Sequence, residues 1–117
     1  MENKSVTRTD LLTVHLSEFH CISNVEIKQI VIPPAGKAEY HLHPCPVIGH
    51  VVSGKLLFQE EGSLPKILHA GQAFYEPKNQ PILHFNNASD YEPLVFIAYY
   101  LLESHEDIIT LLPPLEE

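Results

Sequence analysis

Short apolar runs alternate with polar residues along most of the chain, and turn-forming residues separate them at short intervals. Between Val25 and Ile32, branched apolar residues partly alternate with Glu26 and Lys28, which approaches the two-residue period of a strand. The segment Pro33-Pro34-Ala35-Gly36 follows directly and is typical of a turn. The pattern therefore predicts a strand that ends at Ile32.

Seven further segments have the same character and are bounded by glycine or proline. They are Ala38 to His43, Val47 to Val52, Lys55 to Gln59, Lys66 to His69, Ala73 to Glu76, Ile82 to Asn86 and Leu94 to Leu102. Ten prolines keep these strands short and at edge or turn positions, because proline cannot donate to a ladder hydrogen bond. Helices have almost no room, so the sequence predicts an all-β sandwich or barrel.

The two ends of the chain leave more than one structure open. In the tail from Ser104 to Glu117, Glu106 to Leu112 is compatible with a helical turn or with an extended arm packed on the barrel. The tail is expected to dock on the barrel or on a second subunit through Leu111, Leu112 and Leu115. Leu11 to Leu16 is expected to pair with a neighbouring sheet, because open sheet edges tend to be covered. From both ends we expect a homodimer.

Size and charge restrict the classes of protein and partner. A chain of 117 residues with 44% hydrophobic residues is expected to form a single domain spanning 1–117. The net charge of -8 disfavours nucleic acid and anionic membranes as partners, which leaves a small molecule or another protein. Met1 to Asp10 has no apolar run of the kind that a secretion signal needs, so a cytoplasmic location is expected.

Histidines provide the candidate chemistry. His41 and His43 are two residues apart on a predicted strand, so their side chains project to the same face. Imidazole nitrogen suits divalent transition metals, and His84 on another strand is the candidate third ligand. We therefore predict a metal site formed by His41, His43 and His84 for one ion of Fe, Mn, Ni, Zn or Cu. The other reading is that these histidines satisfy hydrogen bonds without a metal.

The segment around the histidine pair resembles the first sequence motif of the cupin superfamily. That motif runs from a glycine through His-x-His and a glutamate to a closing glycine, and Gly36, His41, His43 and Gly54 match it. Val47 occupies the glutamate position and cannot ligate a metal. Small bacterial single-domain cupins are the most similar, and the resemblance extends over most of the chain.

The second cupin motif departs from its pattern at two positions. Its matching residues are Gly71, Pro77 and Asn86. Asn79 replaces a glycine, which is tolerable because asparagine also adopts left-handed turn conformations. Ile82 replaces the histidine, and His84 follows two residues later. Either the metal shifts toward His84, or a bulge changes the strand register, or the site holds no metal.

The resemblance implies a small antiparallel double-stranded β-helix, the jelly-roll barrel of cupins, with its core at about residues 25–102. It also implies two classes of function. In the first, a three-histidine ion with open positions serves a metal-dependent enzyme on a small molecule, such as an oxygenase or an isomerase. In the second, the chain is a noncatalytic binding or sensing module with a degenerate, metal-free pocket. The fold alone does not choose between them.

Several other residues have less specific assignments. Alternation turns His50 away from the cavity, toward the surface or an interface, and Cys45 is expected to be a structural thiol. No second ligand lies at a useful spacing from the remaining histidines, which are expected to be exposed or turn residues: His15, His20, His69 and His105. Glu39 shares a face with His41 and is a candidate for orienting that ligand. Seven aromatic residues lie on predicted strands, where they form either core or cavity wall: Phe58, Phe74, Tyr75, Phe85, Phe96, Tyr99 and Tyr100.

Overall fold

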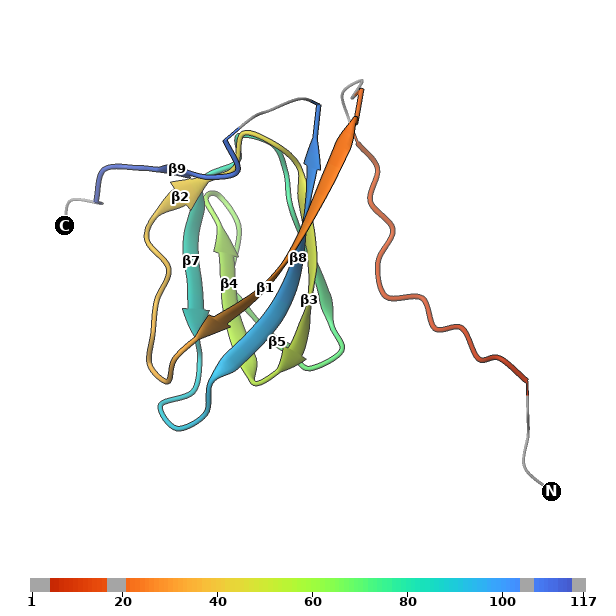
Figure 1. Ribbon diagram of the computed structural model, residues 1–117. Coiled ribbons are helices and arrows are strands. Elements are labelled where there is room, and N and C mark those ends of the chain that lie inside the picture. The colour runs from red at the N-terminus through yellow and green to blue at the C-terminus, as the bar shows by residue number, and fades with distance from the viewer. Residues whose placement is uncertain (1–4, 17–20, 104–106, 115–117) are drawn as a thin grey trace.

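The computed structural model of the chain describes residues 5–16, 21–103 and 107–114, which form strands and turns without a helix (Figure 1). The strands are β1 Asn24–Ile32, β2 His41–Leu42, β3 Val47–Ser53, β4 Lys55–Glu60, β5 Lys66–His69, β6 Ala73–Glu76, β7 Ile82–Asn87, β8 Leu94–Leu102 and β9 Thr110–Leu111. Each of the eight predicted strands is present. The second is reduced to two residues, because between Lys37 and His41 the chain pairs with β7 only at isolated points.

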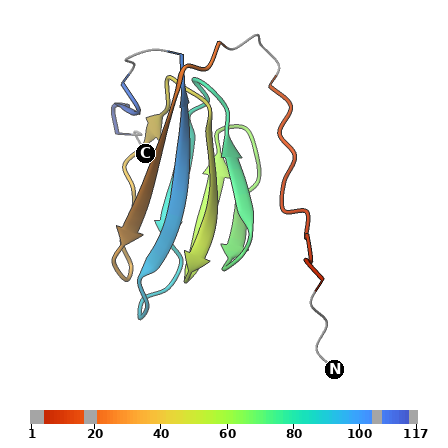
Figure 2. The same cartoon turned by 45° about the vertical axis from the view of Figure 1, so that its right-hand side comes forward.

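The strands form two antiparallel sheets that face each other. One has four strands in the order β1-β8-β3-β6, and the other has five in the order β5-β4-β7-β2-β9. Figure 2 shows the four-stranded sheet in front, with the other sheet behind it. The all-β prediction is therefore confirmed. Within the described part of the chain there is no helix long and apolar enough to cross a membrane.

Apolar side chains from both sheets meet between the layers. Four phenylalanine rings form the centre of this core, with centroids 4.9 Å apart for Phe85 and Phe96 and 5.3 Å apart for Phe74 and Phe85. Phe58 packs edge-to-face with Phe74 at 5.8 Å, as Phe74 does with Phe85, which is a favourable arrangement of aromatic quadrupoles. The two sheets are thereby held together beside the site described below.

Asn79 confirms the expectation made for the second motif. It has a φ of 62° in the turn between β6 and β7, in the left-handed region that asparagine tolerates better than most residues. Its backbone N–H donates to the carbonyl of His43 at 2.8 Å. The turn therefore fixes the backbone beside His43.

The ends of the chain differ from each other. Residues 107–114 are extended rather than helical, and β9 pairs with β2 at the edge of the five-stranded sheet. Residues 5–16 form no strand in the single chain and stand clear of the barrel in Figures 1 and 2. The expected pairing of Leu11 to Leu16 with a sheet is thus not made within one chain, and Leu115 lies outside the described residues.

Candidate metal centre

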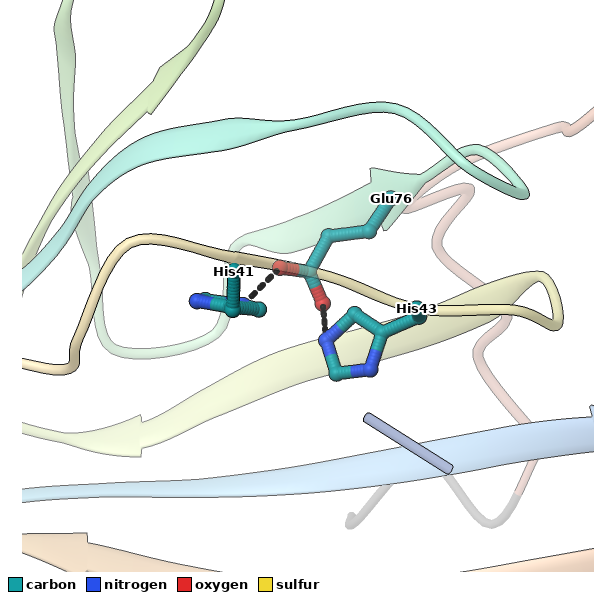
Figure 3. Close-up of side chains that lie close together, drawn as sticks. All are labelled: His41, His43 and Glu76. Carbon is teal, nitrogen blue, oxygen red and sulfur yellow. Dashed lines mark ion pairs between the residues drawn. The ribbon is translucent and has the colours of Figure 1, made fainter. Parts of the chain in front are cut away.

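Three buried side chains converge between the sheets: His41 from β2, His43 just after it, and Glu76 from the end of β6 (Figure 3). One ligand atom from each lies within 4.8 Å of the others. The residues are 4%, 5% and 3% exposed. A carboxylate so deeply buried requires a positive partner, because desolvation of an isolated charge is very costly.

Backbone carbonyls fix the orientation of both imidazoles. Nδ1 of His41 lies 2.6 Å from the carbonyl oxygen of Glu39, and Nδ1 of His43 lies 2.5 Å from that of Ile108. A carbonyl can only accept, so in each ring Nδ1–H is the donor. In the neutral rings this network leaves Nε2 unprotonated, as in metal-ligating histidines held by a second partner.

The Nε2 atoms point at the carboxylate of Glu76. His43 Nε2 is 3.2 Å from Oε2, and His41 Nε2 is 3.4 Å from Oε1. Among the described residues, Oε1 has no hydrogen-bond partner despite being buried. Two imidazole lone pairs and a carboxylate therefore face one another, and such a group of acceptors needs a cation at its centre, either protons or a metal ion.

The pKa values show the same electrostatic coupling. Burial raises the pKa of Glu76, but when the two rings also carry a proton on Nε2, hydrogen bonds and charge from His41 and His43 outweigh it, and the net direction is downward. Burial lowers the pKa of His43, while its hydrogen bond and attraction to Glu76 outweigh that effect and raise it. The carboxylate thus remains ionised and draws positive charge toward the histidines.

The site opens into a cavity of about 400 Å³ between the sheets. The polar groups of the site lie among walls that are largely apolar, which is the usual composition of a small-molecule pocket. The apolar part of the lining is Ile30, Val31, Ile32, Pro33, Ala38, Phe85, Phe96, Ala98 and Ile109. Five members of the predicted aromatic set belong to the core, and three of them, Phe85, Phe96 and Tyr100, also line the cavity; the other two are Phe58 and Phe74.

Tyr100 also lines the cavity, with its ring centroid 5.7 Å from that of His43. Burial, followed by the charges of Glu76, Cys45 and Glu26, raises the pKa of its hydroxyl to about 12. The phenol is therefore neutral near pH 7 and able to donate a hydrogen bond.

A scan against protein families matches residues 28–100 to the Cupin_2 family, described as the cupin domain. The chain belongs to the cupin family. No curated protein is similar enough in sequence to count as a match.

Solved cupin structures have the same fold. A cupin-like protein from Thermotoga maritima is 29% identical over 80% of this chain and 68% of its own, with a TM-score of 0.67. An RmlC-like cupin from Methanocaldococcus jannaschii with a double-stranded β-helix fold is 26% identical over 66% of this chain and 69% of its own, with a TM-score of 0.59. The double-stranded β-helix expected from the motifs is thus confirmed.

Two more distant matches are enzymes with the same fold as this chain. A DMSP lyase from Ruegeria pomeroyi is 22% identical over 80% of this chain, with a TM-score of 0.67, and an oxalate oxidase is 21% identical over 74%, with a TM-score of 0.64. This chain covers 45% of the length of each of these two proteins. At these identities the likeness shows the fold alone.

The structure does not bring His84 into this cupin cluster. Ile82 is opposite Glu60 and His84 is opposite Gln59, so β7 has one extra residue, Leu83, relative to β4. This bulge breaks the alternation: Ile82 and Phe85 are buried, while His84 between them is exposed. A bulge was one of the three alternatives that the sequence allowed for the second motif. It is present, and it turns His84 away from the cavity.

Glu76 is the member of the cluster that the sequence interpretation missed. Val47, at the glutamate position of the first motif, is the direct neighbour of Glu76 across β3 and β6. Ile82, at the histidine position of the second motif, is paired with His41. A carboxylate from the adjacent strand therefore lies beside the position where Val47 offers no ligand. The available signal was alternation, because Glu76 shares a face with the core residue Phe74.

The other predicted residues have mixed outcomes. His50 faces away from the cavity as expected, with Nε2 3.3 Å from the hydroxyl of Tyr99, and Cys45 is buried outside the cluster. Glu39 orients His41, but through its backbone carbonyl, while the residue itself is exposed. His15 and His69 are exposed, as expected. His20 and His105 lie outside the described residues.

Proposed function

We propose that this cupin binds one divalent transition metal through Nε2 of His41, Nε2 of His43 and the carboxylate of Glu76. The observation that carries the proposal is the set of three buried acceptors that face one another, with both imidazoles oriented by backbone carbonyls. Two histidines and one carboxylate with open positions are the ligand set of non-heme Fe(II) oxygenases. Zn, Mn, Ni and Cu are the competing ions.

We propose further that the metal acts on a small molecule held in the cavity, in an oxygenase or isomerase reaction. When bound, the ion supplies a Lewis-acid or redox centre with positions open to substrate. The apolar walls hold the body of the molecule and exclude water, which strengthens polar interactions within the site. The neutral hydroxyl of Tyr100 donates a hydrogen bond to a polar group of that molecule.

The first test measures metal per chain in tag-free protein after anaerobic reconstitution with Fe, Mn, Ni, Zn or Cu. We expect about one ion per chain in the wild type and a 10- to 100-fold loss of affinity or more in His41→Ala and Glu76→Gln. His84→Ala is the matched control, because this histidine is exposed and apart from the cluster. It should bind metal as the wild type does, and circular dichroism verifies the fold of each variant.

Two results would contradict the metal site. One is wild-type protein that takes up none of the five ions, and the other is Glu76→Gln protein that retains wild-type affinity. The first result favours the alternative function, a noncatalytic cupin that binds a small molecule in the apolar cavity. Protons shared between Glu76 and the two histidines would then neutralise the acceptors, as the 3.2 Å contact of His43 allows.

A further inference from the structure

The cavity beside the candidate metal centre has a polar end and an apolar end. Three inward residues of β8 line it in succession, namely Tyr100, Ala98 and Phe96. Tyr100 lies against His43, with ring centroids 5.7 Å apart, whereas Phe96 packs against Phe85 in the core, with centroids 4.9 Å apart. The lining therefore changes from polar to apolar along a single strand.

The end of β1 forms the other wall of the apolar end. Its register with β8 places Ile30 opposite Phe96, and Val31 and Ile32 continue the lining. Successive residues of a strand are about 3.3 Å apart, so the cavity extends about 13 Å along β8 from Tyr100 to Phe96. With a volume of about 400 Å³, this space suits an elongated molecule with a polar head at one end.

Charged side chains are scarce along this cavity. Apart from the histidines, Glu76 and Lys37 are the titratable residues with charge in the part of the lining that the structure describes. Lys37 is exposed and lies opposite Asn86, which is paired with Leu57 and follows the inward Phe85. Residues that pair across strands share one side of the sheet, so the ammonium group of Lys37 is directed to solvent. The apolar end thus offers no partner for a charged group.

The C-terminal strap, residues 107–114, covers the polar end. Its strand β9 pairs with β2 at His41, and the carbonyl of Ile108 accepts the Nδ1–H of His43. Ile109 follows directly and lines the cavity. Figure 1 shows β9 beside β2, at the end of the barrel where β8 finishes. Ile109 is therefore the apolar side chain that the strap contributes next to the histidines.

The position of Ile109 suits it to select the shape of a ligand. The residue is 45% exposed although it lines the cavity, so a ligand that fills the adjacent space buries more of its apolar surface, which favours binding. Its side chain is branched at Cβ and has few rotamers, so it does not move aside easily. A narrow group next to the polar head gains this contact, whereas a branched group collides with the side chain.

We propose that the cavity binds an elongated amphipathic molecule, and that Ile109 determines its specificity. The single polar head lies beside the histidines, the unbranched apolar body follows β8 toward Phe96, and Ile109 excludes substituents next to the head. The inference rests on the small-molecule function proposed above and names the class of molecule. It does not require the metal, because the neutral hydroxyl of Tyr100 donates to the head whether or not an ion is bound.

The test is isothermal titration calorimetry of the full chain, in the presence of chelator, with straight-chain primary alcohols from butanol to decanol as probes. We expect the affinity to rise about fourfold per methylene until the apolar end is filled.

The second series measures selection at the head by comparing octan-1-ol with both enantiomers of octan-2-ol, which carry a methyl group beside the hydroxyl. The wild type should prefer octan-1-ol at least tenfold, and Ile109→Ala should reduce this preference to less than threefold. Ile109→Val keeps the branch at Cβ and should retain the preference. Ile67→Ala is the matched control, because Ile67 is 44% exposed and lies on β5, outside the cavity lining.

Four outcomes would overturn the proposal. They are a wild type that binds none of the alcohols, a wild type that binds octan-1-ol and octan-2-ol equally, an unchanged preference in Ile109→Ala, and an equal loss of preference in Ile67→Ala. Metal content is measured separately and should be the same in all of these proteins, because neither isoleucine supplies a ligand atom. Protein that takes up no ion but prefers octan-1-ol would contradict the metal site and support the present inference.

Discussion

At the scale of single residues, the direction of the Nε2 lone pairs of His41 and His43 makes the cluster suited to bind a cation. Each imidazole donates Nδ1–H to a backbone carbonyl, so both Nε2 atoms are left to face the carboxylate of Glu76. The carbonyl that holds His43 belongs to Ile108, 65 residues further along the chain. The C-terminal segment is thus part of the site, although it supplies no ligand atom.

Metal-free protein should show this pairing in the pH dependence of its stability. The pKa of Glu76 is lowered from 4.5 in the folded state, so its contribution is present above pH 4.5 and lost as the pH falls through the folded value. The pKa of His43 is raised from 6.5, so its contribution is present below pH 6.5 and lost as the pH rises through the folded value. The contributions of Glu76 and His43 to stability are therefore both present between pH 4.5 and 6.5.

Urea unfolding in the presence of chelator, from pH 3.5 to 8.5, measures this effect. The free energy of unfolding of the wild type should exceed that of Glu76→Gln by the largest amount between pH 4.5 and 6.5, and this difference should decline at lower and higher pH. Identical pH profiles for the two proteins would show that the pair is not coupled as the geometry indicates.

At the scale of elements, irregularities in the strands determine which side chains meet. The bulge at Leu83 in β7 turns His84 outward while keeping Phe85 in the core. The close approach of β6 to β3 has a similar role, because it brings Glu76 opposite Val47. Gly49 on β3 permits that approach: its missing side chain leaves room for the ring of Phe74.

Gly49→Ala tests this close approach. The added Cβ would collide with the ring of Phe74 and lie 2.7 Å from the carbonyl oxygen of Ile97. We expect a loss of about 1–3 kcal/mol in the free energy of unfolding, as is typical of overpacking. Ser53→Ala, at the exposed end of the same strand, is the control and should change stability by less than about 0.5 kcal/mol. Equal urea midpoints for the two variants would contradict this role of Gly49.

At the scale of the whole molecule, the metal site connects parts of both sheets. His41 belongs to the five-stranded sheet, Glu76 to the four-stranded sheet, and the carbonyl of Ile108 to the C-terminal segment. An ion held by His41, His43 and Glu76 would link both sheets and, through His43, the C-terminal segment, so its binding energy adds to the stability of the fold.

Metal should therefore raise the melting temperature. With free ion at 100 times its dissociation constant, the added stability is about 2.7 kcal/mol, which corresponds to roughly 10 °C for a chain of this size. Calorimetry should show this shift in the wild type and in His84→Ala, but not in Glu76→Gln. A shift of equal size in Glu76→Gln would mean that the ion binds at another place.

The sequence by itself determined the strands and two of the three side chains of the site. The two-residue period, interrupted by proline and glycine, predicted all eight strands of the barrel core, because alternation reports which residues face a buried layer. The same rule placed His41 and His43 on one face. Tertiary structure decided the rest. A bulge breaks alternation without a sequence signal, so the prediction for His84 put its side chain on the wrong side of β7, and Glu76 joins the histidines only because β6 and β2 lie in facing sheets. Contacts between strands far apart in sequence depend on sheet order and register, which the local pattern of a single strand does not encode.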